Sequence, residues 1–113
     1  MQYLLLIYSA ESDDANLDGA TLMADYGAFT QGIVQNGNFK SADRLKPVAT
    51  ATTVRVKDGK TLTTDGPFAE TREQLGGYYL VEAKDLDEAV GIAAKVPTAR
   101  HGSVEVRPVW SMS

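Results

Sequence analysis

The sequence predicts an α+β protein with a ferredoxin-like order of elements, namely strand, helix, strand, strand, helix, strand, plus an additional β-hairpin. Three observations support this fold class. The 113 residues are enough for one domain with its own core. Two segments carry apolar residues at helical spacing, and the segments around them are apolar or alternating, as strands are. There are no repeats, linkers or low-complexity segments, so we expect residues 1–113 to form a single domain.

The first strand is expected over Tyr3–Tyr8, where every residue is apolar. A strand covered on one face would alternate, so this pattern predicts a central strand buried on both faces. In a ferredoxin-like unit the helices cover one face of the sheet. Because no third helix is predicted, a second copy of the chain is the expected cover of the other face, and two-fold dimers are the commonest oligomers.

The first helix is predicted by apolar residues at spacings of four, three and four. They are Leu22, Tyr26, Phe29 and Ile33. Asn16 or Asp18 is suited to cap its first amides, and Asn36-Gly37 provides a left-handed stop.

The second helix begins at a capping-box pattern, with Asp85 as the cap and Glu88 three residues later. Pro97 ends it. Its predicted apolar face consists of Leu86, Ala89, Val90, Ala93 and Val96.

The hairpin is predicted between these helices. Thr52–Lys57 alternates, Asp58-Gly59 favours a type I′ turn, and Lys60–Thr64 forms the returning strand. Residues 38–47 fit either a short strand or a loop. Pro67 is suited to open a short helical turn that runs to Glu73.

The last two strands are expected at Tyr78–Glu82 and Ser103–Val109. Gly76-Gly77, just before the first of them, indicates either a bulge or a close approach of a ligand to the backbone.

Composition excludes several classes of function. The chain has no cysteine, so it has no disulfide scaffold, thiolate nucleophile or cysteine-bound metal. Its net charge of −4 argues against nucleic-acid binding, which depends on phosphate neutralisation by Lys and Arg. The apolar N-terminus lacks the pattern of a signal peptide, and no apolar run reaches the length of a membrane span. We therefore expect a cytoplasmic protein with no cofactor and no metal.

Asp65 and His101 are the candidate catalytic residues. An acid in a tight turn beside glycine and proline can have a raised pKa and act as a general base, although the same turn also suits an Asx-turn cap of the Gly66–Phe68 amides. His101 is the single histidine, and imidazole suits acid–base work near neutral pH. The alternative is an ordinary surface histidine in the loop before the last strand. One histidine and no cysteine leave only carboxylates as further metal ligands, which argues against a metal site.

The candidate ligand-binding residues include tyrosines and an arginine. Tyr26 and one of Tyr78 and Tyr79 are candidates to line a pocket, because neighbouring strand residues face opposite sides of a sheet. Core packing with the hydroxyl at the rim is the alternative. Arg72 is suited to hold a carboxylate, or belongs to a solvated turn with Glu70 and Glu73.

The segment Thr64–Tyr79, which includes Asp65-Gly66-Pro67-Phe68, resembles the DGPF branch of the YCII-related family. Tyr3–Tyr8, Tyr26–Phe29, Ala51–Val56 and Ser103–Pro108 resemble the same branch, so the resemblance extends over nearly the whole chain.

The resemblance implies a dimeric α+β barrel built from two ferredoxin-like units. It also implies a functional link to extracytoplasmic-function sigma factors, beside which relatives occur. The wider group is linked to small-molecule enzymology through a His on the first helix and an Asp shortly before the last strand. Here the first helix has no His and Tyr26 lies in about that region, while Val96-Pro97-Thr98 contains no Asp, so this pair is absent at those positions.

Three functions follow as hypotheses. The first is a small-molecule-binding or accessory domain, whose pocket includes Tyr26, Tyr79 and Arg72 together with the turn Gly66, Pro67 and Phe68, and which is coupled to sigma-factor-dependent transcription. The second is a cofactor-free isomerase or lyase that uses Asp65 as base with His101 or a tyrosine as its partner. The third is a structural homodimer without a ligand.

Overall fold

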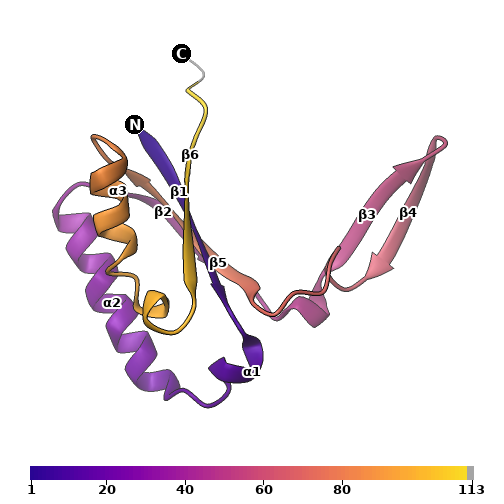
Figure 1. Ribbon diagram of the computed structural model, residues 1–113, viewed down its shortest axis with the longest axis horizontal. Helices are drawn as coiled ribbons and strands as arrows, with labels where there is room; N and C mark the ends of the chain where they lie inside the picture. Colours follow the sequence, from indigo (N-terminus) through magenta and orange to yellow (C-terminus); the bar gives the residue numbers. More distant parts are fainter. Residues whose placement is uncertain (112–113) are drawn as a thin grey trace.

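The computed structural model describes residues 1–111, which form a four-stranded antiparallel sheet, two main helices and a two-stranded hairpin that stands apart from them (Figure 1). In chain order the elements are β1 (Gln2–Ser9), α1 (Glu11–Asp14), α2 (Gly19–Gln35), β2 (Phe39–Arg44), a 3₁₀ turn (Val48–Thr50), β3 (Thr52–Lys57), β4 (Lys60–Asp65), β5 (Gln74–Glu82), α3 (Leu86–Ala93), a second 3₁₀ turn (Pro97–Arg100) and β6 (Ser103–Pro108).

The main sheet has the strand order β2-β5-β1-β6 and every neighbouring pair is antiparallel. With the β3–β4 hairpin set aside, this is the βαββαβ plan expected from the sequence, with the first strand in the centre. The ferredoxin-like α+β prediction is therefore confirmed. The ambiguous residues 38–47 contain the edge strand β2.

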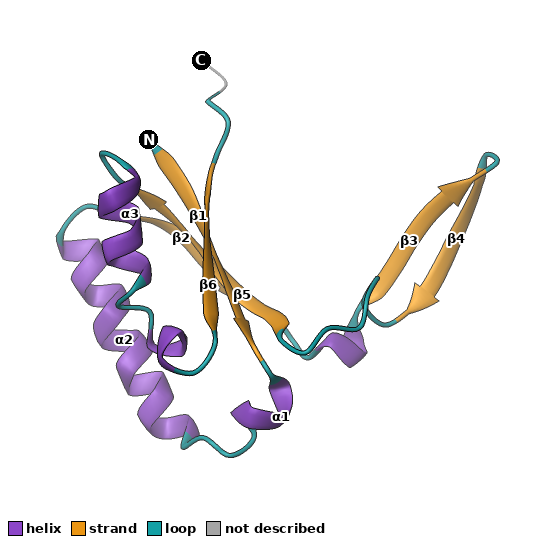
Figure 2. Cartoon of the chain, in the orientation of Figure 1, coloured by secondary structure: helices purple, strands orange, loops and turns teal. Residues whose placement is uncertain are grey.

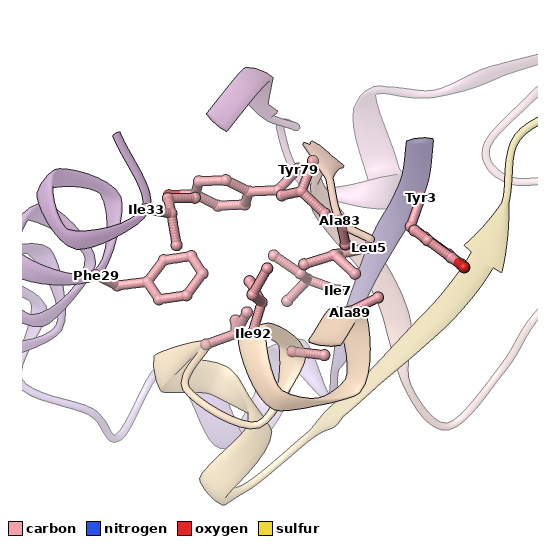
Figure 3. Packing of buried hydrophobic residues seen from close by; sticks show 12 residues of the cluster. Tyr3, Leu5, Ile7, Phe29, Ile33, Tyr79, Ala83, Ala89 and Ile92 are labelled. Carbon is pink, nitrogen blue, oxygen red and sulfur yellow. The ribbon is translucent and has the colours of Figure 1, made fainter. Parts of the chain in front are cut away.

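The core lies between the sheet and the two main helices (Figure 3). Tyr79 is at its centre, where its ring stacks on Tyr26 and meets Phe29 and Phe39 edge-on. Its hydroxyl shares a 2.6 Å hydrogen bond with that of Thr30, so the polar atom is satisfied inside the core.

The two faces of β1 differ in their cover. Tyr3, Leu5 and Ile7 are buried on the helix side. Leu4, Leu6 and Tyr8 alternate with them and are only half-buried. Leu80 of β5 lies opposite Leu4 on the same side and is also half-buried. We call these four residues the open face, because α2 and α3 both lie on the other side of the sheet (Figure 1).

Helix α2 begins and ends as its sequence predicts. Asp18 is the cap, and its carboxylate accepts hydrogen bonds from the Ala20 amide and the Thr21 hydroxyl. Gly37 follows the helix with a φ of 77°, and the Asn38 amide donates to the Ile33 carbonyl, which completes a Schellman motif.

Helix α3 has the predicted cap but a different buried face. The Asp85 carboxylate accepts from the Glu88 amide. Ala89, Ala93 and Val96 are buried as expected, and Ile92 joins them. Leu86 and Val90 are about half exposed, so their assignment to the core is wrong. The helix is rotated so that Ile92, one turn after Glu88, points to the sheet.

The hairpin β3–β4, residues 52–65, is called the arm, and its strands pair only with each other (Figure 2). At its tip Asp58 and Gly59 both have positive φ, as the predicted type I′ turn requires. The link from the arm to β5 is irregular between residues 66 and 73, so the helical turn expected from Pro67 does not form. At Gly76 a bulge shifts the register between β1 and β5, which confirms the bulge as the reason for Gly76-Gly77.

Within residues 1–111 no helix is long and apolar enough to cross a membrane.

Candidate functional site

The structure divides the predicted site residues between two places. His101 and Tyr26 lie at the end of the sheet where β1 ends and β6 begins. The remaining ones, apart from core residue Tyr79, lie at the base of the arm or in the link after it; they are Asp65, Gly66, Pro67, Phe68 and Arg72. Within residues 1–111, no hydrogen bond, ion pair or ring contact joins the two groups.

The base of the arm is open to solvent. Asp65 is exposed at the end of β4, and no described residue donates a hydrogen bond to its carboxylate. Gly66 has a φ of 100°; its amide donates to the Ala51 carbonyl at 2.7 Å, and its carbonyl accepts from Thr53. Phe68 is 79% exposed. In one copy of the chain, this motif therefore closes the base of the arm, and it is not part of the cavity described below.

His101 lies at the other end of the sheet, against a carboxylate that the sequence did not single out. Its Nε2 is 3.5 Å from Oδ1 of Asp14, at the end of α1, which is an ion-pair distance rather than a hydrogen bond. The buried Ser9 hydroxyl donates to the other oxygen, Oδ2, at 2.7 Å. Asp14 is therefore held between a buried serine and the imidazole.

The backbone explains why His101 reaches this position. Its loop leaves the 3₁₀ turn Pro97–Arg100, and the Gly102 amide donates to the Thr98 carbonyl at 2.7 Å. A Cβ on Gly102 would lie 2.2 Å from the Tyr8 carbonyl oxygen and 3.1 Å from the Ser9 Cβ. Only glycine lets the loop lie this close to the end of β1, and this contact places His101 beside Asp14.

A pair of hydroxyls borders the same loop. The Tyr26 and Thr98 hydroxyls share a hydrogen bond of 2.6 Å, and Thr98 is buried. Burial raises the pKa of Tyr26, and the negative charge of Asp14 adds to the rise. Tyr26 thus remains a neutral phenol within electrostatic reach of Asp14.

A cavity of about 250 Å³ opens beside His101, between the loop and the first turns of α2. We call it the His101 pocket. Its lining consists of Leu17, Asp18, Thr21, Leu22, Asp25, Arg100 and His101.

The charges of the pocket are largely fixed by internal partners. Arg100 pairs with Asp25 at 2.8 Å. Hydrogen bonds from the Thr21 hydroxyl and the Ala20 amide lower the pKa of Asp18, so its carboxylate is ionised at neutral pH. With a neutral imidazole the lining carries a net charge of −1, from two carboxylates and one guanidinium. Such a pocket disfavours an anionic ligand.

The imidazole is the reactive group of this lining. Its Nε2 faces Asp14, and within residues 1–111 its Nδ1 makes no hydrogen bond. An Asp behind a His is the arrangement that orients imidazole for proton transfer. Among the described residues, no three His, Asp or Glu side chains are grouped to hold a metal ion.

Of the residues that meet at this corner, the sequence pattern had singled out His101 and Tyr26 but not Asp14, Ser9 and Thr98. Asp14 belongs to an acidic, turn-prone run whose composition gives no sign of which carboxylate is used. Ser9 and Thr98 carry no motif. The available signal was topological, since the segments after β1 and before β6 meet wherever these strands pair.

Comparison with known proteins supports the family suggested by the motif. The sequence model of the YCII-related domain matches residues 1–113. An uncharacterized protein of Rhizobium meliloti (strain 1021), R00369, is 39% identical over 114 residues, which cover 96% of this chain and 92% of that protein.

Proposed function

We propose that this chain, which belongs to the YCII-related family, binds a small organic molecule in the His101 pocket. The observation that carries the proposal is that the only histidine of the sequence lines a cavity and has a fixed carboxylate 3.5 Å from its Nε2. The volume of about 250 Å³ is below the roughly 300 Å³ at which small-molecule sites usually begin, so the pocket suits only a compact ligand.

The lining indicates the chemistry of this ligand. Leu17 and Leu22 offer apolar contact, and the net negative charge favours a neutral or amine-bearing molecule over a carboxylate or phosphate. Nδ1 of His101 would form the directional hydrogen bond.

Native mass spectrometry of the protein purified gently from its own host tests this proposal. We expect a discrete bound mass that is lost in His101→Gln, since glutamine cannot present the imidazole edge. Asp65→Asn is the matched control and should retain the mass, because Asp65 lies at the base of the arm. Retention by His101→Gln together with loss from Asp65→Asn would move the site to the arm and refute the assignment.

A protein purified without ligand can be screened through its single histidine. The His101 ring gives one ¹H–¹³C signal pair, which should shift with small amines and neutral carbonyl compounds and remain unchanged with the matching carboxylates. A panel in which only the anions shift this signal would contradict the electrostatic reasoning.

A second function, cofactor-free proton transfer, is favoured by the Ser9–Asp14–His101 chain. In this version His101 is the general base, in place of Asp65, and Asp14 orients it and stabilises the imidazolium. An isomerase step would remove a proton from carbon next to a carbonyl and return it to another atom of the same molecule. Incubation of the identified ligand in D₂O should then give deuterium uptake that falls by roughly 10² or more in His101→Gln. No uptake with the wild-type protein would leave binding alone.

The resemblance to the DGPF branch adds a functional link to an extracytoplasmic-function sigma factor, and a cytoplasmic location belongs to the same proposal. Co-purification of the tagged chain with such a factor, from its own host, would support the link. Recovery of the chain without any sigma factor, at both low and high ligand concentration, would count against it.

Pairing of two copies completes the proposal. The half-buried Leu4, Leu6, Tyr8 and Leu80 of the open face are the residues a second chain would cover, as the dimeric α+β barrel implied by the resemblance requires. Analytical ultracentrifugation should give a mass of about twice 12.2 kDa.

A further inference from the structure

The chain exposes far more surface than its mass requires. A folded monomer of 12.2 kDa exposes about 6,100 Å². This chain exposes 8058 Å², an excess of about 2,000 Å² over the size law. Its radius of gyration is 16.0 Å, where about 13 Å is typical of 113 residues.

The arm accounts for much of this excess. It leaves the body on the side away from α2 and α3, so the arm and the open face lie on the same side of the molecule (Figure 1). Every residue of β4 and most of β3 are exposed. An isolated two-stranded hairpin is marginally stable in water, so such an arm normally packs against something.

The two faces of the arm are different. Register places Val54 opposite Thr63 and Val56 opposite Thr61, which makes one face uncharged and β-branched apart from Asp65 at its base. We call this the valine face; Val54 and Val56 are 58% and 71% exposed. The other face carries three cations and a leucine, namely Arg55, Lys57, Lys60 and Leu62. A largely uncharged, β-branched face opposite a charged one is the pattern of a ribbon covered on one side.

We infer that the valine face of each arm packs on the open face of a second copy of this chain, and that two reciprocal arms form the dimer contact. The inference rests on the pairing of two copies proposed above and specifies how it is made. A two-fold axis brings each arm to the other copy's open face, so the valine face and the open face are both buried by the same contact. Burial of the excess area from both chains would remove about 4,000 Å², which lies in the range of obligate dimers.

Charge supports a second copy as the occupant. The arm has three basic and two acidic residues and hence a charge of +1. Because the net charge of the whole chain is −4, the rest of the chain carries −5. Within residues 1–111, none of the three arm cations has an ion-pair partner in its own chain. With the valine face inward, these cations lie on the outer face of the ribbon and remain hydrated.

The test compares two lysine substitutions on opposite faces of the arm. Val56→Lys places an ammonium group in the proposed contact and should weaken the dimer by roughly tenfold or more in sedimentation velocity. Leu62→Lys makes the same kind of change on the cationic face and should leave the dimer intact. Val56 is already exposed in one chain, so both variants should keep the wild-type circular dichroism spectrum.

The absence of cysteine allows a direct map of the contact. Val56→Cys labelled with a maleimide–benzophenone should crosslink under light to peptides of β1 or β5 from the other chain, identified by mixing isotopically labelled and unlabelled protein.

The outcomes separate the two proposals. A monomeric wild-type protein would refute the pairing and the arm contact together. A dimer that survives Val56→Lys, dissociates equally with Leu62→Lys, or crosslinks only within one chain would refute the arm contact and leave the pairing in place.

Discussion

Gly102 gives the sharpest test of how the His101 pocket is built, because it has no room for a side chain. A Cβ there would be 2.2 Å from the Tyr8 carbonyl oxygen, and real contacts of this kind essentially never fall below 3.0 Å. In Gly102→Ala the loop must therefore move away from β1 by at least 0.8 Å. The Gly102 amide is tied to Thr98 at 2.7 Å, so the 3₁₀ turn must move with it.

The expected cost of Gly102→Ala is about 1–3 kcal/mol of unfolding free energy, as for other overpacked sites. At about 4 °C per kcal/mol for a domain of this size, the Tm should fall by roughly 4–12 °C. The same movement should separate His101 from Asp14, now 3.5 Å apart, and shift the ring signals of the single histidine. Thermal denaturation and ¹H–¹³C spectra measure the two effects independently.

Gly27→Ala is the matched control for Gly102→Ala. Gly27 lies within α2, and a Cβ there meets nothing within 4 Å, so alanine should stabilise the helix by about 0.5–1 kcal/mol. A Gly102→Ala variant with the Tm of the wild-type protein and unshifted His101 signals would contradict the predicted clash, since the loop would then tolerate a Cβ beside the Tyr8 carbonyl oxygen.

Two further predictions concern stability. Tyr26→Phe leaves the buried Thr98 hydroxyl without its partner and should cost about 1 kcal/mol at pH 7 in urea denaturation. Burial raises the pKa of Tyr26 above its ordinary 10.0, so the folded state keeps a proton that the unfolded chain releases, and the free energy of unfolding falls as the pH rises above about 10. Tyr26→Phe should remove part of that fall, and an unchanged dependence of stability on alkaline pH would contradict the prediction. Asp85→Ala removes the α3 cap that accepts a hydrogen bond from the Glu88 amide, and it should lower the free energy of unfolding by about 1 kcal/mol. Asp87→Ala, which caps nothing, should lower it by less than half as much. Equal losses of stability would show that the cap contributes little.

Local chemistry made most of the fold predictable from the sequence. The helix ends are fixed by short-range hydrogen bonds or backbone angles that the residue types there favour, at Asp18, Gly37 and Asp85. The turn at Asp58-Gly59 was predictable for the same reason. In each case the cause and the structure lie within four residues of each other.

The buried face of α3 was not predictable in the same way. Both Ile92 and Val90 fit an apolar stripe, and only the contact with the sheet decides which of them is covered. Similarly, the composition of residues 66–73 allowed a helical turn, but the segment must span from the arm to β5, where Gln74 accepts a hydrogen bond from the Glu11 amide. Such outcomes depend on tertiary distances that one-dimensional patterns do not contain.

Strand topology explains why His101 lies beside a carboxylate that no sequence motif indicates. β6 runs antiparallel to β1 with Tyr8 opposite Ser103, so the segment that follows β1 and the segment that precedes β6 meet at one corner of the sheet. Asp14 comes from the first segment and His101 from the second. Neither segment carries a motif of its own, and the two are almost ninety residues apart in the sequence. The imidazole and the carboxylate therefore become neighbours only because the pairing of β1 with β6 brings the two segments together.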